Sequence, residues 1–314
     1  MHTRLDPQPS GAATPLGIFR LLGACALVLL GGPGSASPER PPATPVEVAV
    51  SVPPQAYFVE RIGGDHVRVQ VMIPAGASPE TYSPTPRQRA GLDRARAYVL
   101  VGHPGFVFER VHIRPLLEGR PSLRVIDMME PLDGAEPAPR ERATDPHVWL
   151  SPAAVAAAAV EIGRSLVALA PEHGDEFRAN LGVFLEEIEE LDSGIRESLS
   201  AVPPDPAARS FLVVHPAWGW FAREYALVQI AIEAQGKEPG PAELIPLIER
   251  ARSSRLRVVF VQRGFSQRRA RLIAGEIGAD VVELDPLARD WLDNMVRVAA
   301  ALQGALAGGG GSHG

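Results

Sequence analysis

The sequence has little cysteine, lysine or excess positive charge. Cys25 is its only cysteine, so no disulfide is expected and the stability of the fold must come from its hydrophobic core. Lys237 is its only lysine, and the net charge of −6 leaves no basic face of the kind that binds nucleic acid. Neither a disulfide framework nor a nucleic-acid partner is therefore predicted.

Common enzyme signatures are also missing. The chain has no His-Glu-x-x-His pair, no Gly-x-Ser-x-Gly turn and no Gly-rich phosphate-binding loop. Zinc metalloproteases, α/β-type serine hydrolases and nucleotide-binding enzymes carry these patterns. Their absence argues against those enzyme classes, and we predict that the protein is not an enzyme.

The N-terminal apolar run at 21–30 is too short to span a bilayer as a helix. Arginines precede it and small residues follow at 31–37, which is the layout of a secretory signal peptide. We therefore expect residues 1–36 to be a cleaved signal peptide and the protein to be exported. Cys25 lies inside the run, in a context that resembles a lipoprotein box, so a lipid anchor through Cys25 is the alternative.

Beyond a Pro-rich, flexible segment at 37–45, apolar strand-like runs alternate with helical patterns. This alternation is typical of α/β proteins with parallel sheets flanked by helices. Strands are predicted at 46–52, 66–73, 97–101, 210–214, 258–261 and 281–284. Helices are predicted at 55–62, 85–95, 152–169, 172–199, 218–225, 242–253, 266–277 and 291–306.

The predicted helix at 172–199 is long and amphipathic, because its apolar residues recur every three or four positions. It separates two groups of alternating strands and helices. We therefore predict an α/β lobe at 46–170, a rigid linking helix within 171–202, and a second α/β lobe at 203–306. The Gly-rich tail at 307–314 is predicted to be disordered.

Three potential metal ligands lie in loops where parallel sheets bind ligands, at the carboxyl ends of strands. His215 follows the strand at 210–214 and Asp285 follows the strand at 281–284, while His147 precedes the helix at 152–169. Each residue alone could be a strand stop, a turn starter or a structural histidine. Imidazole and carboxylate in three such loops together favour a divalent metal site.

Five segments in register resemble the metal-binding subunit of bacterial zinc and manganese ABC importers, the periplasmic solute-binding proteins of the zinc-uptake type. The similarity extends over 46–306, nearly the whole mature chain, and its segments are 76–86, 145–152, 213–225, 235–244 and 284–288. It implies one divalent metal held in the cleft between two lobes. It also implies that His147, His215 and Asp285 are ligands.

The chain departs from this family at the position of its usual first ligand, a histidine, where Glu80 stands. Glu80 can still bind metal, since carboxylate oxygen is an accepted Zn²⁺ ligand. The alternative fourth ligand is His103, at the end of the strand at 97–101. Zn²⁺ is the expected metal, although a set of two imidazoles and two carboxylates also tolerates Mn²⁺ or Fe²⁺.

The resemblance implies that a monomer captures Zn²⁺ in the periplasm and delivers it to an ABC-transporter permease. A zinc-dependent hydrolase with an open coordination position is one alternative, and a metal-binding surface adhesin or lipoprotein is another. The remaining histidines of the mature lobes, at 66, 112 and 173, are predicted to have surface roles. The Pro- and Glu-rich loop at 130–144 contains no histidine, which argues against metal scavenging by that loop.

Overall fold

The computed structural model describes residues within one compact unit, Ala43–Gly314. The described ranges are 44–132, 145–233, 240–254, 256–262 and 267–307. The predicted signal peptide with Cys25, most of the segment at 37–45, nearly all of the loop at 130–144, Lys237 and the tail from 308 lie outside the described residues.

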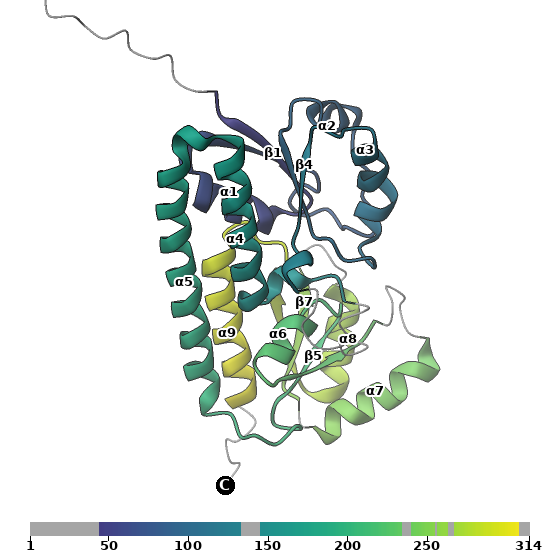
Figure 1. The fold of residues 1–314 in the computed structure, drawn as a ribbon. Helices are drawn as coiled ribbons and strands as arrows, with labels where there is room; N and C mark the ends of the chain where they lie inside the picture. Colours follow the sequence, from purple (N-terminus) through teal and green to yellow (C-terminus); the bar gives the residue numbers. More distant parts are fainter. Residues whose placement is uncertain (1–43, 133–144, 234–239, 255, 263–266, 308–314) are drawn as a thin grey trace, which may run out of the picture. The chain divides into compact units, whose positions relative to one another are not determined.

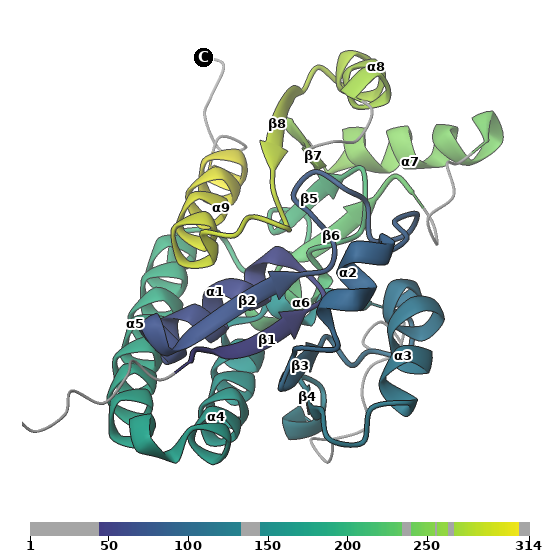
Figure 2. The same ribbon diagram turned by 90° about the horizontal axis from the view of Figure 1, so that it is seen from above.

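The first sheet consists of four parallel strands in the order β2-β1-β3-β4 (Figure 2). Its strands are β1 Val46–Val50, β2 Val67–Val71, β3 Ala97–Leu100 and β4 Arg124–Asp127. The two central strands, β1 and β3, are almost wholly buried, as expected for parallel strands that are covered on both faces. The edge strands β2 and β4 keep polar residues that face water.

Three helices accompany this sheet: α1 Pro53–Gly63, α2 Pro86–Gly91 and α3 Arg114–Glu118. Prolines occupy the first positions of α1, and the Gln55 side chain accepts the backbone N–H groups of Ser51 and Val52 at 2.9 and 3.0 Å. A π-helical turn, Glu109–Ile113, precedes α3. We call the first sheet and helices α1–α3 the first lobe.

The second sheet repeats the arrangement of the first, with four parallel strands in the order β6-β5-β7-β8. Its strands are β5 Ser210–Val213, β6 Val228–Ala231, β7 Val258–Gln262 and β8 Asp280–Leu284. The helices beside it are α6 Gly219–Glu224, α7 Pro241–Ser253 and α8 Gln267–Ile277. We call this sheet with α6–α8 the second lobe.

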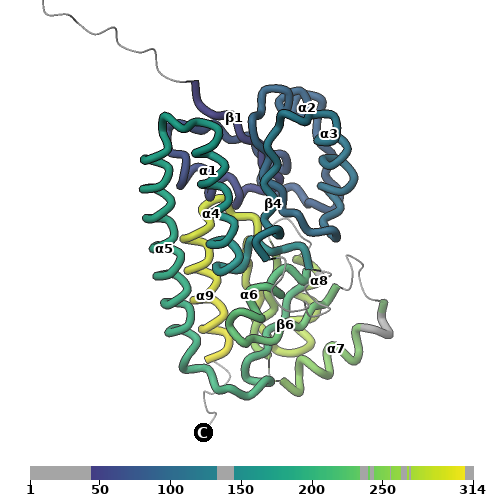
Figure 3. Tube along the Cα trace, viewed as in Figure 1, coloured from purple at the N-terminus to yellow at the C-terminus, as the bar shows by residue number. Residues whose placement is uncertain are grey.

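Three longer helices, α4 Pro152–Leu169, α5 Gly174–Ser200 and α9 Trp291–Ala307, run beside one another (Figures 1 and 3). The Ser151 side chain caps α4 by accepting the N–H of Ala154. Among the described residues, α4 alone has the length and hydropathy of a membrane span, and half of it is buried in the fold. Because α4 packs along α5, it serves here as a core helix.

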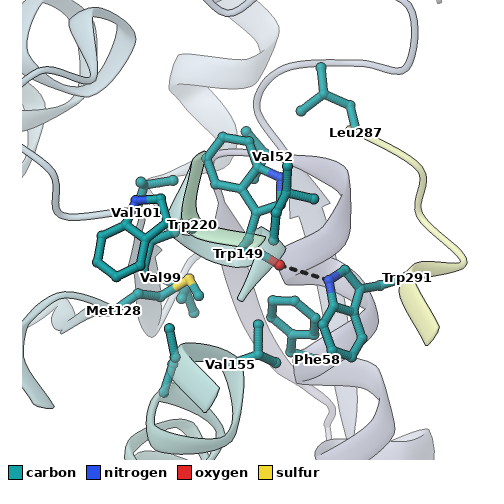
Figure 4. Packing of buried hydrophobic residues seen from close by; sticks show 14 of the residues in the cluster. Val52, Phe58, Val99, Val101, Met128, Trp149, Val155, Trp220, Leu287 and Trp291 are labelled. Atoms are coloured by element: carbon teal, nitrogen blue, oxygen red, sulfur yellow. Dashed lines mark hydrogen bonds between the residues drawn. The ribbon is translucent and has the colours of Figure 1, made fainter. Parts of the chain in front are cut away.

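Two hydrophobic clusters stabilise the fold. The larger joins the first sheet, the long helices and one side of the second sheet, while the smaller packs the second sheet against α7 and α8. Trp149 lies in the larger cluster near Phe58 and Trp291, and its carbonyl accepts the Trp291 indole N–H at 2.7 Å (Figure 4). The loop before α4 is therefore anchored in the core.

The predicted fold class is confirmed, and most predicted elements lie within a few residues of their observed bounds. Helix α4 has its predicted bounds, and α5 is shifted by only one or two residues. The helix predicted at 85–95 was too long, because α2 ends at Gly91. Two edge strands, β4 and β6, were missed, and so were the π-helical turn and α3. The predicted lobe boundaries stay predictions.

Candidate metal site

A cavity of about 890 Å³ opens between loops of the two lobes. Glu80 and residues 105–107 line it from the first lobe, His147 from the loop before α4, and His215 from the second lobe. Three of the predicted ligands thus share one cavity. Each comes from a different loop, as expected for a site at the carboxyl ends of parallel strands.

His147 is held by a carboxylate two residues before it in the chain. Its Nδ1 lies 2.7 Å from Asp145 Oδ1, which also accepts the backbone N–H of His147 at 3.0 Å. Both side chains are nearly buried, at 12% and 11% exposure. An ionised carboxylate can only accept, so Nδ1 carries the proton and the Nε2 lone pair is left for a ligand.

His215 has the same kind of partner from a different part of the chain. Its Nδ1 lies 3.1 Å from Oε2 of Glu233, which follows β6, and the Glu233 side chain is 11% exposed. Glu80 reaches toward the same nitrogen, with Oε1 at 4.0 Å, and is 47% exposed. Glu233 therefore orients the imidazole, while Glu80 stands at the open side of the cavity.

The two imidazoles meet edge to face where they line the cavity. Their ring centroids are 5.3 Å apart and their planes are nearly perpendicular, at 82°. The His147 ring also meets the Trp149 indole edge-on, with centroids 5.2 Å apart. His147 and His215 are thus close enough to contact a single small ligand.

The other two predicted ligands lie outside this cavity. Asp285 directly follows β8 and lines a neighbouring cavity of about 520 Å³, where its Oδ1 accepts the Leu287 N–H at 2.9 Å. Leu287 lines both cavities, so the loop that carries Asp285 forms the wall between them. His103 is 2% exposed, and its Nδ1 accepts the Gly105 N–H at 2.9 Å.

In the part of the chain that the structure describes, no three His, Cys, Asp or Glu side chains are already arranged to hold a metal ion. The remaining histidines lie elsewhere. His66 stacks on His173 with centroids 3.6 Å apart, and His112 lies 3.4 Å from the Ser83 hydroxyl. None of the three lines the cavity.

The model of the family described as the periplasmic component A of the zinc-uptake complex matches residues 48–305. The chain belongs to this family. A Chlamydia muridarum protein described by name as metal-binding is 27% identical over 262 residues, covering 82% of this chain and 91% of that one. The high-affinity zinc-uptake protein ZnuA of Bacillus subtilis is 25% identical over 293 residues, 88% of each chain.

A solved structure of a ZnuA superposes with a TM-score of 0.76 at 41% identity and covers 83% of this chain and 99% of that one. The resemblance to periplasmic metal-binding proteins of the zinc-uptake type is therefore confirmed. As a member of this family, the chain is a solute-binding protein, the class that serves ABC importers.

Tryptophan side chains join the loops of this zinc-uptake protein. The Trp149 indole donates to the carbonyl of Pro286 at 2.7 Å, beside Asp285, and the Trp220 indole donates to the carbonyl of Asp145 at 2.9 Å. Asn294 donates to the carbonyl of Asp285 at 2.8 Å. The loops that carry His147 and Asp285 are therefore tied to each other and to the second lobe.

Two carboxylates, buried Glu109 and half-buried Glu224, bind segments around the site. Burial raises the pKa of Glu109 to about 7, although Ser51 and the N–H groups of Val101 and Gly102 oppose the shift. Burial also raises the pKa of Glu224, which accepts the Ser151 hydroxyl and the Ala153 N–H at the start of α4. Both glutamates tie separate segments together.

The partners Glu233 and Asp145 were missed as functional residues in the sequence. Asp145 could have been found, because it lies two residues from His147 in the segment that carries the family resemblance. Glu233 had no such signal, since it follows β6, a strand that the sequence analysis did not predict. Its contact with His215 depends on the pairing of β5 with β6.

Proposed function

We propose that the protein captures Zn²⁺ in the periplasm between His147 and His215 and delivers it to the permease of an ABC importer. The single observation that supports this most strongly is the pair of neighbouring imidazoles, each with its Nδ1 hydrogen-bonded to a carboxylate. That arrangement is the usual support for a metal-binding histidine, because it fixes the tautomer and the orientation of the ring.

The spacing of the rings suits one zinc ion. Two imidazoles bound to a tetrahedral Zn²⁺ at about 2.0–2.1 Å place their ring centroids roughly 5 Å apart. The centroids of His147 and His215 are 5.3 Å apart. The ion would lie on the Nε2 side of both rings, away from Asp145 and Glu233.

Glu80 and Asp285 complete the proposed ligand set. Glu80 Oε1 lies 4.0 Å from His215 Nδ1, on the same side of the ring as Glu233, so the partly exposed Glu80 carboxylate must turn to reach an ion at Nε2. Asp285 lies behind the wall formed by its own loop, so binding requires that loop to bring the carboxylate into the cavity. His103 remains the alternative, although its Nδ1 is already used within its own loop.

The proposed set of two neutral imidazoles and two carboxylates gives no net charge once a divalent ion is bound. Such a site binds Zn²⁺ more tightly than Mn²⁺ or Fe²⁺, because intrinsic affinity follows the Irving–Williams order.

The family match gives no support to the hydrolase alternative. Export through the N-terminal segment, ordinary cleavage rather than a lipid on Cys25, and a monomeric state belong to the same proposal.

The test is zinc titration of the mature protein against a competing chromophoric chelator. His215→Ala should lose more than the roughly 10–100-fold in affinity that removal of an outer partner causes. The matched control is His173→Ala, because His173 stacks on His66 outside the cavity and its loss should leave the Kd for zinc unchanged.

Equal zinc affinity in the wild type and His215→Ala would overturn the proposal. A crystal of the zinc-loaded protein, measured above and below the zinc absorption edge, would identify the ligands directly. An anomalous peak away from both His147 and His215 would contradict the proposed site.

A further inference from the structure

Resting on the proposed function, we infer that Gly219 and Trp220 of the second lobe are positioning residues that set the metal affinity of His147 by holding Asp145. Neither residue contacts the ion in the proposed site. Both contact the aspartate that orients the imidazole, and both lie at the start of α6, 70 or more positions later in the chain. The orientation of His147 would thus depend on the second lobe.

The first contact fixes the backbone of Asp145. The indole N–H of Trp220 donates to the Asp145 carbonyl at 2.9 Å, and the Trp220 ring is 4% exposed. Arg223, one turn further along α6, lies over the same ring at 4.8 Å from its centroid. The Trp220 side chain is therefore fixed on both sides, and it holds residue 145 in place just before the ligand at 147.

The second contact fixes the Asp145 side chain. A Cβ atom at Gly219 would lie 2.4 Å from Asp145 Oδ2, which is closer than nonbonded atoms can approach. The other oxygen, Oδ1, bonds to His147 at two points, so the carboxylate cannot turn away without releasing the imidazole. Only glycine at 219 lets α6 approach the carboxylate this closely.

His215 has its carboxylate partner within its own lobe. Its partner Glu233 follows β6, which pairs directly with β5, so both belong to the second lobe. If α6 moved away from the loop at 145–151, Asp145 would lose both of its contacts with α6, while the pair of Glu233 and His215 would stay within its own lobe. Separation of these segments would therefore weaken metal binding on one side first, which provides a route for release.

A double-mutant cycle with Asp145→Ala tests this inference, because residues that act through a common partner are non-additive. Alone, Trp220→Phe should raise the Kd for zinc about fivefold, the effect of one hydrogen bond. Gly219→Ala should raise it at least as much, since the new Cβ displaces the carboxylate. Asp145→Ala should raise it roughly 10–100-fold.

In the Asp145→Ala background, Gly219→Ala should have no further effect on the Kd, because the carboxylate that it displaces is gone. Trp220→Phe should have less than its fivefold effect, because only its hydrogen bond to the carbonyl of residue 145 remains to be lost. The matched control is Tyr225→Phe, which removes the 2.9 Å hydrogen bond from Tyr225 to Asp192 beside α6 and should leave the Kd unchanged. The second readout is the chemical shift of the proton on His147 Nδ1 in the NMR spectrum of the metal-free protein. This signal should move upfield in Trp220→Phe, because the hydrogen bond to Asp145 weakens, and stay in place in Tyr225→Phe.

Multiplicative effects in the double variants, or an unchanged Kd in Trp220→Phe, would overturn the inference. These outcomes are distinct from failure of the proposed function, in which His147→Ala itself would bind zinc as tightly as the wild type. If Gly219→Ala does not fold, judged by circular dichroism, the Trp220→Phe cycle decides the question alone.

Discussion

The two sheets have the same strand order, yet the space at the carboxyl ends of their central strands is used differently. In the second lobe this space holds His215, just after β5. In the first lobe it is filled by Glu109, which binds Ser51 after β1 and the N–H groups of Val101 and Gly102 after β3. The first-lobe side of the site therefore takes its candidate ligands from other loops, those of Glu80 and His147.

The difference between Glu109 and Glu233 shows how one side-chain type serves two purposes. Glu109 is 1% exposed and accepts only from neutral groups, so burial dominates and raises its pKa. Glu233 accepts from an imidazole that faces the cavity. The first carboxylate should control the stability of its lobe, and the second should control the affinity of the site.

The largest expected effect is on the pH dependence of stability. The pKa of Glu109 is about 7 in the folded protein and 4.5 in the unfolded reference, so the folded state binds more protons between these values. The free energy of unfolding should therefore fall as pH rises from 4.5 to 7, by about 3 kcal/mol in total, and change little above pH 7. Urea unfolding at a series of pH values measures this.

Glu109→Gln should reduce this fall, because the amide does not titrate, and Glu224, whose pKa burial also raises, should account for part of what remains. Glu118→Gln is the matched control, since Glu118 is exposed near the end of the same segment. Parallel pH profiles for the wild type and Glu109→Gln would show that the carboxyl is not the group responsible.

The second prediction concerns Glu233, the other carboxylate of the comparison. Glu233→Ala should weaken zinc binding roughly 10–100-fold, because the His215 ring loses the partner that fixes its orientation. Glu109→Gln should leave zinc affinity nearly unchanged, because Glu109 does not line the cavity. Zinc titration and urea unfolding of both variants, Glu233→Ala and Glu109→Gln, give the four values needed.

If Glu109→Gln weakened zinc binding as much as Glu233→Ala, the separation between a structural and a site-related carboxylate would be wrong. Glu233→Gln refines the test, because the amide oxygen can still accept from Nδ1 but carries no charge. Its zinc affinity should lie between those of the wild type and Glu233→Ala.

The sequence was sufficient for the parts of the molecule with strong apolar periodicity. The bounds of α4 and α5 and the position of β1 were predicted because each buries a long or continuous apolar face. The edge strands β4 and β6 were missed because they are four residues long and carry charged or polar side chains among the apolar ones. Short edge strands form by pairing with a neighbour, which no local pattern records.

The residues of the candidate site were likewise predicted only where a local sequence pattern marks them. His147, His215 and Asp285 could be proposed because they lie in segments with a family resemblance, next to strands or helices that the sequence predicted. Glu233 could not, since its role depends on the pairing of β6 with β5. The placement of Asp285 behind its own loop is likewise a matter of loop conformation, which local sequence does not determine.

The smallest expected effect concerns Glu80, where the family resemblance places a histidine. Glu80 is 47% exposed and 4.0 Å from His215 Nδ1. Glu80→His exchanges one accepted Zn²⁺ ligand for another, so it should change zinc affinity less than removal of His215 does. It should raise the preference for Zn²⁺ over Mn²⁺, because imidazole suits Zn²⁺ better than the carboxylate that Mn²⁺ prefers.

The ratio of the two dissociation constants, measured by competition titration in the wild type and in Glu80→His, is the informative quantity. Glu118→His is the control, since it adds a histidine at an exposed position that does not line the cavity. An unchanged ratio would remove Glu80 from the ligand set. In that case the first lobe would have to contribute through His103, whose ring must first release the Gly105 N–H.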